Sequence, residues 1–388
     1  MNSDPSSRSS ITALLGKYHK NVMYGIILAL ITFFFHQWHN PYLGTLFAAI
    51  SIALLSLSVS EVAEVLAERL EEPYGSFVLT FSAVIVEIIL LFMIMLAAYD
   101  NPAAMETVKG GIISAVIVDM NVLLGLAVFI GGLAFKEQQH NEDTSNTYTT
   151  ILLVAASALL VPSILHYTNN HEADLILASI IISVVLFLFY IVIFIFQTKT
   201  HSHFFKATAR SRIFRYKKRL NDDEDETEEV EKDIYELANT YVNFGIIFIL
   251  IALIGVLAEV FAIDGMHLVS YYDFPVGLAG LIIAIISVAP EIVTAVKAAK
   301  DDQIQRVINI AMGASTVSIM LTVPLLMALS YFFTPIPLTL DFNTLQIGAL
   351  ILTILLAWKT TDDGQTNYFE GSSHLFFFIC YAIIVALI

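Results

Sequence analysis

The stretch SFVLTFSAVIVEIILLFMIML, from Ser76 to Leu96, is long and apolar enough to cross a bilayer as one helix. Its one charged residue, Glu87, lies near the middle. A carboxylate at that depth costs roughly 2.5–3.5 kcal/mol on insertion scales, so such residues normally face a polar interior and serve a function. The stretch therefore predicts a membrane protein whose helices enclose a polar centre.

The composition agrees with that fold class. The chain has 388 residues, of which 57% are hydrophobic and 14% are charged; a soluble domain carries about 25% charged residues. We expect an all-α polytopic membrane protein in contact with lipid. The net charge of −16 argues against a nucleic-acid partner. The single cysteine, Cys380, excludes an intramolecular disulfide and a cysteine-based metal site.

Hydropathy predicts eleven membrane spans. The first apolar run is interpreted as a retained helix, because the residues before it have no small-residue cleavage site. The spans lie at about 21–38, 41–60, 75–98, 110–134, 149–167, 173–196, 241–263, 275–298, 304–333, 343–358 and 373–388.

The distribution of positive charge predicts the orientation. With the N-terminus in the cytoplasm and the C-terminus outside, every Lys and Arg except Lys109 lies on the cytoplasmic side. Positive residues collect in cytoplasmic loops of membrane proteins, so this pattern supports eleven spans. We expect a multi-pass membrane protein with this orientation.

The longest break between spans, 199–240, divides the chain. It begins basic and becomes acidic, with ten Asp or Glu residues between Asp222 and Glu236. The predicted organisation is a cytoplasmic segment at 1–20, an extra helix at 21–38, a five-helix unit at 41–198, the cytoplasmic linker 199–240 and a second five-helix unit at 241–388. Because five is odd, two such units lie in opposite orientations, as in the inverted repeats of secondary transporters.

Weak internal similarity supports the repeat. Each unit has Ala-Glu-Val at the end of its first helix, Pro-x-Gly entering its second helix and a glutamate inside that helix, as in SEVAEVLAERLEEPYG and IGVLAEVFAIDG. The two glutamates are Glu87 and Glu291. The order of these features matches better than the residues between them.

Small and polar residues share a face with each glutamate. Such residues let helices approach closely and bond across the interface. At helical spacing the faces comprise Ser76, Thr80, Ala83 and Glu87; Ala284, Ser287, Glu291, Thr294 and Ala298; Gly111, Ser114, Asn121 and Gly125; and Ala311, Ser315, Ser318 and Thr322.

These faces predict an all-oxygen cation site. Glu87 and Glu291 are the expected ligands of a cation or of protons, with Asn121, Ser114, Ser287 and Ser315 as additional candidates. Such oxygens suit Ca²⁺ or alkali cations. Without a cation, two facing carboxylates repel each other and take up protons. One pair can thus hold either a cation or protons, which is the chemical minimum for antiport, and no resident cofactor is implied.

Several residues have alternative interpretations. Asp119 lies about 200° around its helix from Asn121, so both cannot face one cavity; it either supports the site from behind or packs against another polar helix. A lone membrane glutamate can also be structural. The acidic run from Asp222 to Glu236 is either a solvated linker or an element that attracts cations. No catalytic or ATP-binding motif is present, so an enzyme is not indicated.

The segments EEPYGSFVLTFSAVIVE (Glu71 to Glu87) and SVAPEIVTAVKAAKDDQIQRVINIAMGASTVSIMLTVP (Ser287 to Pro324) resemble the ChaA-type bacterial antiporters. These belong to the Ca²⁺/H⁺ exchanger (CAX) branch of the Ca²⁺/cation antiporter superfamily. The resemblance covers nearly the whole chain. It implies eleven helices with inverted five-helix repeats, proton-coupled export of Ca²⁺ with Na⁺ and K⁺ also accepted, and a central role for Glu87 and Glu291.

The chain departs from the family pattern at two amide positions. Typical Ca²⁺/H⁺ exchangers have Gly-Asn shortly before the first glutamate, where this chain reads SAVIVE, and a glutamine where Val317 stands. These departures favour a broader selectivity that includes monovalent cations. From another functional class, a passive cation channel or a cation-sensing membrane scaffold stays open as the alternative. The oligomeric state is not predicted.

Overall fold

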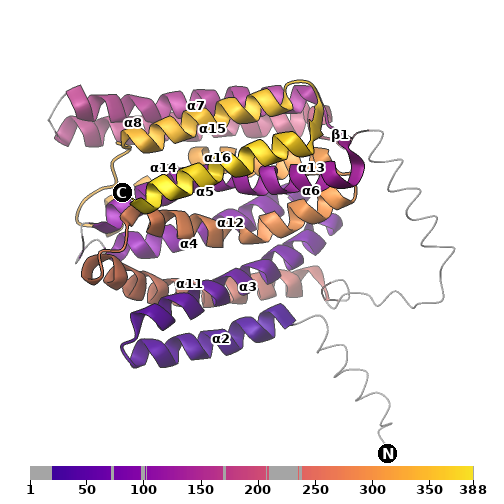
Figure 1. The fold of residues 1–388 in the computed structure, drawn as a ribbon. Helices are drawn as coiled ribbons and strands as arrows, with labels where there is room; N and C mark the ends of the chain where they lie inside the picture. The colour runs from indigo at the N-terminus through magenta and orange to yellow at the C-terminus, as the bar shows by residue number, and fades with distance from the viewer. Residues whose placement is uncertain are drawn as a thin grey trace, which may run out of the picture.

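The computed structural model describes residues 20–70, 74–97, 101, 103–168, 172–206, 208, 235 and 238–387. Within them, eleven helical rods run roughly parallel or antiparallel in one bundle (Figure 1). The rods are α2 (Lys20–Gln37), α3 (Pro41–Arg69), α4 (Tyr74–Leu96), α5–η2–α6 (Ala103–Val118, Asp119–Leu123, Leu124–Phe135), α7 (Glu142–Thr168), α8–η3 (Glu172–Ile195, Phe196–Thr200), α11 (Thr240–Tyr271), α12 (Val276–Lys300), α13–η5–α14 (Ile304–Val317, Ser318–Thr322, Val323–Phe333), α15 (Thr344–Thr361) and α16 (Tyr368–Leu387).

The rods confirm the predicted all-α fold with eleven helices. Nine helices of the described chain are long and apolar enough to cross a membrane, and α4 adds a shorter apolar helix, Phe81–Leu96. Many large apolar side chains on the outside of the bundle are exposed, such as Leu188 of α8 and Phe248 of α11. An apolar outer surface of this kind is what a bilayer requires.

The bundle has three layers. The pairs α2 with α3 and α3 with α11 form one side, and α7, α8 and α15 form the other, with α4, α5, α6, α12, α13 and α16 between them (Figure 1). The middle layer is closely packed at glycines. A Cβ on Gly280 of α12 would lie 2.7 Å from the backbone nitrogen of Gly111 in α5, so the absence of side chains lets these two helices touch.

Loops predicted to share one side of the membrane contact each other. At one end of the bundle, β1 (Glu137–Gln139) pairs antiparallel with β2 (Gln365–Asn367), which precedes α16. At the same end, Gln138 donates to Asp302 at 3.0 Å. At the opposite end, Asn101 donates to Ser270 at 2.5 Å. We call these the β1 end and the far end.

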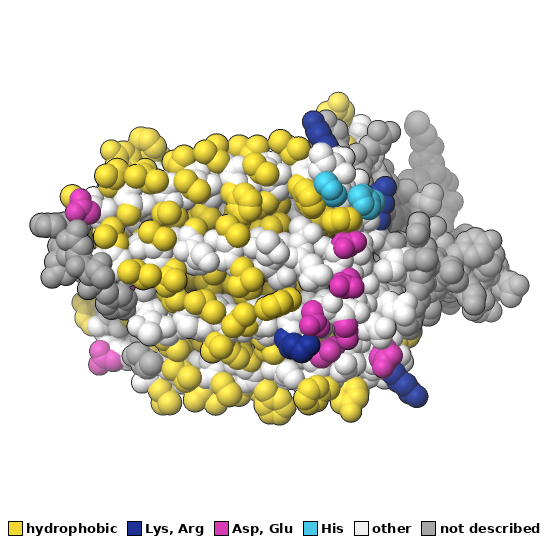
Figure 2. Space-filling model, turned by 90° about the horizontal axis from the view of Figure 1, so that it is seen from above, with side chains coloured by type: hydrophobic (Ala, Val, Ile, Leu, Met, Phe, Trp, Pro, Cys, Tyr) yellow, Lys and Arg dark blue, Asp and Glu magenta, His cyan; other side chains and the backbone are white. Residues whose placement is uncertain are grey.

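Positive charge gathers at the β1 end. Of the Lys and Arg residues that the structure describes, all except Lys109 lie there, as the predicted orientation requires. Figure 2 shows apolar side chains over the middle of one face, with Lys, Arg and His gathered toward this end.

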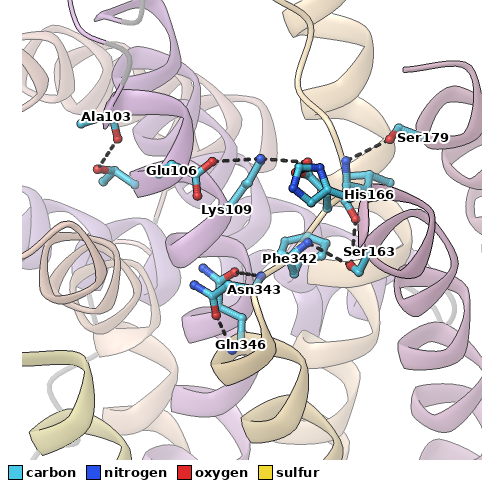
Figure 3. Close-up of polar contacts among 12 residues, drawn as sticks. Ala103, Glu106, Lys109, Ser163, His166, Ser179, Phe342, Asn343 and Gln346 are labelled. Atoms are coloured by element: carbon cyan, nitrogen blue, oxygen red, sulfur yellow. Dashed lines mark hydrogen bonds and ion pairs between the residues drawn. The ribbon is translucent and has the colours of Figure 1, made fainter. Parts of the chain in front are cut away.

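At the far end, residues 334–343 form a non-helical segment that is tied to three helices (Figure 3). Leu340 donates its backbone N–H to Ser179 at 3.0 Å, and Phe342 donates to Ser163 at 2.9 Å. The exceptional Lys109 is buried and contacts Asp341 of this segment at 2.9 Å and Glu106 at 3.0 Å. The charge of Lys109 is thus neutralised at the far end, the side on which membrane proteins normally have few positive residues.

The segment 1–19 and nearly all of the acidic run lie outside the described residues, as do Glu71 to Pro73. The division into two five-helix units stays a prediction, which one structural feature supports: a π-helical turn interrupts the rod that follows each glutamate helix.

Candidate functional site

Glu87 of α4 and Glu291 of α12 line one cavity in the middle layer, although 204 residues separate them in sequence. The cavity is small, with space for about one water-sized molecule. Its lining consists of Ala83, Val84, Glu87, Asp119, Ser287, Val288, Glu291, Ala314 and Ser318. None of these described lining residues is Lys, Arg or His, so the cavity is acidic.

Two carboxylate oxygens at the cavity lack hydrogen-bond partners. Ser318 donates its hydroxyl to Oε2 of Glu87 at 2.9 Å, and Ser315 donates to Oδ2 of Asp119 at 3.2 Å. The second oxygens, Oε1 of Glu87 and Oδ1 of Asp119, are buried without a partner. Buried polar oxygens are normally satisfied, and an unsatisfied one calls for a proton or an unseen ligand.

The π-helical turns place two of these side chains. Each turn begins with a residue that lines the cavity: Asp119 opens η2 and Ser318 opens η5. In η2 the N–H of Leu124 bonds to the carbonyl of Asp119, five residues back, so one extra residue is accommodated in the turn. Single π turns within α-helices occur frequently at functional sites.

One face of α12 becomes more exposed with distance from the cavity. Ser287 is buried, Glu291 and Thr294 are half-buried, and Lys297 is exposed. These residues follow one face of the helix toward its last turn at Lys300, which lies at the β1 end. The exposure of this face therefore rises from the cavity toward the end where positive charge collects.

Two predicted ligands lie elsewhere. Asn121 is buried and donates to Thr353 of α15 at 2.9 Å, while its oxygen contacts His374 of α16 at 3.0 Å. Ser114 bonds to the hydroxyl of Tyr381 at 3.1 Å. Neither belongs to the cavity lining, because Asn121 faces α15 and α16 and Ser114 faces α16.

The other candidates lie in or beside the cavity. Ser287 belongs to the lining, although its hydroxyl donates to the carbonyl of Ala284 at 3.0 Å. Ser315 reaches the cavity only through Asp119. Val317 packs against Val84 in a small apolar cluster. The side chains of Ser76 and Thr80 are not among those described.

Sequence reasoning did not select Ser318 or settle Asp119. Ser318 was on a predicted polar face, three residues after Ser315, and this shared face is the sequence signal that could have selected it. Asp119 was correctly separated from Asn121, but which of them faces the glutamates depends on the π turn. In the described part of the chain, no three His, Cys, Asp or Glu side chains form a ready-made metal site.

Comparison with known sequences places these features in a family. Residues 40–199 and 242–387 match the family model described as sodium/calcium exchanger protein. The sodium-potassium/proton antiporter ChaA of Escherichia coli (strain K12) is 28% identical over 341 residues, which are 88% of each chain. The Ca²⁺/H⁺ antiporter of Aphanothece halophytica is 23% identical over 361 residues, which are 90% of this chain and 92% of that one.

Solved structures share the fold. Native YfkE superposes with a TM-score of 0.74 at 20% identity and covers 96% of this chain and all of its own. The H⁺/Ca²⁺ exchanger CAX gives a TM-score of 0.64 at 14% identity, over 96% of this chain and 92% of that one. At these identities the likeness concerns the arrangement of helices.

Proposed function

The chain belongs to the sodium/calcium exchanger protein family, and we propose that it is a multi-pass secondary antiporter that exports Ca²⁺, and also Na⁺ or K⁺, in exchange for protons. Relatives that match most of its length are named as sodium-potassium/proton and Ca²⁺/H⁺ antiporters. The substrate class proposed here is therefore an inorganic cation together with the proton.

One observation of the structure carries the proposal. Carboxylates from two distant helices meet at an acidic cavity in the membrane-spanning bundle, and a buried oxygen of Glu87 has no partner there. A permanently ionised group in that position would be costly unless a cation or a proton compensates its charge. The pair Glu87 and Glu291 therefore suits a site that is always occupied, either by a cation or by protons.

The proposed exchange follows from this competition. Hard oxygen ligands bind Ca²⁺ and alkali cations, and the same oxygens bind protons when the cation leaves. Ser318 orients the Glu87 carboxylate by donating to Oε2, which leaves Oε1 directed to the exchanged ion. Since both ions need the same oxygens, release of one permits binding of the other, and a proton gradient can drive cation export.

We place the protein in the bacterial inner membrane with the β1 end in the cytoplasm. The described Lys and Arg residues that gather at that end support this orientation, because positive residues stay on the cytoplasmic side. The N-terminus is then cytoplasmic and the C-terminus lies outside. In this orientation the face of α12 that carries Glu291 becomes more exposed toward the cytoplasm, from which the cation would be taken.

The test is proton coupling in everted membrane vesicles. A respiratory substrate acidifies the lumen, and a fluorescent probe follows its pH while CaCl₂, NaCl or KCl is added. We expect at least CaCl₂ to release protons from the lumen of vesicles that contain the protein, but not from vesicles of a strain without it. If no cation in this panel releases protons, the proposed antiport is wrong.

The same assay separates the antiporter from a passive cation channel. A channel needs several weak sites along an open pore, whereas this structure has one deep carboxylate pair. A protonophore applied before the cation removes the gradient. Cation uptake that continues unchanged without a gradient, and that follows the membrane potential, would indicate a channel. A cation-sensing scaffold would move neither ion.

A further inference from the structure

The two π-helical turns present different chemistry to the two glutamates. The turn η5 packs against α4, and its first residue, Ser318, donates to Glu87. The turn η2 packs against α12, the helix of Glu291, and its first residue is Asp119. Corresponding positions thus carry a hydroxyl on one side of the cavity and a carboxylate on the other.

Asp119 adds a third carboxyl group to the cavity. Its side chain is 1% exposed, lines the cavity and receives one hydrogen bond, from the neutral Ser315. Its Oδ1 has no partner, and among the described lining residues no cationic side chain balances it. The carboxylate is therefore available to interact with a cation held by Glu87 and Glu291.

We infer that Asp119 is a specificity-determining residue, whose negative charge favours Ca²⁺ over Na⁺ and K⁺ at the cavity. The inference rests on the proposed function and deepens it. In the described residues, no three acidic side chains are close enough to enclose a metal ion. We therefore assign Asp119 an effect through its charge and not a place among the direct ligands. The charge count of an oxygen site is one of the features that tune its Ca²⁺ affinity.

Electrostatics gives the expected size of the effect. The Coulomb energy between two charges is proportional to their product, so one negative charge stabilises a divalent cation twice as much as a monovalent cation at the same distance. Affinity depends exponentially on free energy. Removing the charge should therefore weaken Ca²⁺ binding by about the square of the factor by which Na⁺ binding weakens: about 10-fold for Na⁺ would mean about 100-fold for Ca²⁺.

The substitution Asp119→Asn tests this, because it removes the charge while its amide oxygen can still accept from Ser315. Purified wild-type and variant protein are titrated with CaCl₂ and NaCl in detergent, with thermal stability as the binding readout, and both are assayed for proton-coupled transport in proteoliposomes. The matched control is Asp264→Asn, a buried carboxylate of α11 outside the cavity lining that pairs with His36.

The expected result is a larger loss of Ca²⁺ than of Na⁺ affinity in Asp119→Asn, and an unchanged ratio of the two in Asp264→Asn. Equal fold-losses for both ions, no loss at all, or a wild type that binds no Ca²⁺ would overturn the inference. An unliganded variant with the wild-type melting temperature shows that folding is intact. If it unfolds, Asp119→Glu, which keeps the charge, must retain the wild-type ion ratio. Absence of coupled transport in wild type would instead refute the proposed function.

Discussion

At the scale of single residues, Lys109 shows how a charge is accommodated in an apolar bundle. Its side chain is 7% exposed, and its ammonium group lies between Glu106 and Asp341 (Figure 3). Burial alone would raise the pKa of Asp341, but hydrogen bonds from Lys109 and Thr339 and the charge of Lys109 hold it below its ordinary value of 3.8. The ion pair therefore favours the folded state when Asp341 is ionised.

The substitution Asp341→Asn should lower stability in a pH-dependent way. A carboxyl with a lowered pKa contributes stability above its unfolded value, and this contribution is lost as the pH falls through its folded value. We expect a loss of about 2 kcal/mol near neutral pH, typical of a hydrogen bond to a charged group, that shrinks below about pH 4. Thermal unfolding in detergent at both pH values measures it. An equal loss at both would show that the charge of Asp341 is not responsible.

The polar faces illustrate what single residues reveal in sequence. The alternation of small, polar and apolar residues was enough to predict that Glu87 and Glu291 share a polar centre, and the structure places both at one cavity. The structure does not place Asn121 at that centre, because its side chain bonds to α15 and α16. A regular helical projection cannot represent the extra residue of η2, so it could not show which side of the rod faces α12.

At the scale of helices, the contact of α5 with α12 positions the cavity. Gly280 allows the two backbones to meet at Gly111, about two helical turns before Asp119 in the same rod as η2. The glycine pair is a built-in close approach rather than a flexible hinge, because both residues lie inside helices. Both helices also carry residues that line the cavity or lead directly into its lining: Ser287 and Glu291 in α12, and Asp119 at the end of α5.

The substitution Gly280→Ala should separate α5 from α12. The new Cβ would lie 2.7 Å from the backbone nitrogen of Gly111 and 2.8 Å from the carbonyl carbon of Gly110, so the backbone itself must move. We expect a loss of about 1–3 kcal/mol and reduced exchange. Gly348→Ala in α15 is the control, since nothing lies within 4 Å of its Cβ, and it should stabilise slightly. Equal melting temperatures for the two variants would contradict the close contact.

At the scale of the whole molecule, the fold follows from hydropathy and charge. The predicted spans correspond to the eleven rods, because stretches that must satisfy their backbone in lipid form helices. The pairing of β1 with β2 was not foreseen; short polar segments carry too weak a pattern. That pairing requires the loops before α7 and α16 to lie on the same side of the membrane. The predicted topology places them on the same side as well.

The orientation can be tested with single cysteines in a Cys380→Ser background. Lys136 lies at the β1 end beside β1, and the exposed Pro335 lies in the far-end segment. A membrane-impermeant maleimide should label Pro335→Cys in intact cells and Lys136→Cys only in everted vesicles. The reverse pattern would place the β1 end outside, and labelling of both cysteines in intact cells would contradict the predicted number of spans.

Proton-coupled cation transport by Glu87→Gln and Glu291→Gln in proteoliposomes tests whether these two carboxylates perform the exchange. Glutamine keeps the shape of the side chain but can neither take up a proton for release nor neutralise a cation. We predict that each variant abolishes exchange yet folds with equal or higher thermal stability, since removal of a membrane carboxylate removes its burial cost. In wild type, apparent cation affinity should fall as the pH drops, because protons compete for the same oxygens. Transport near the wild-type rate by Glu87→Gln would show that this carboxylate is structural.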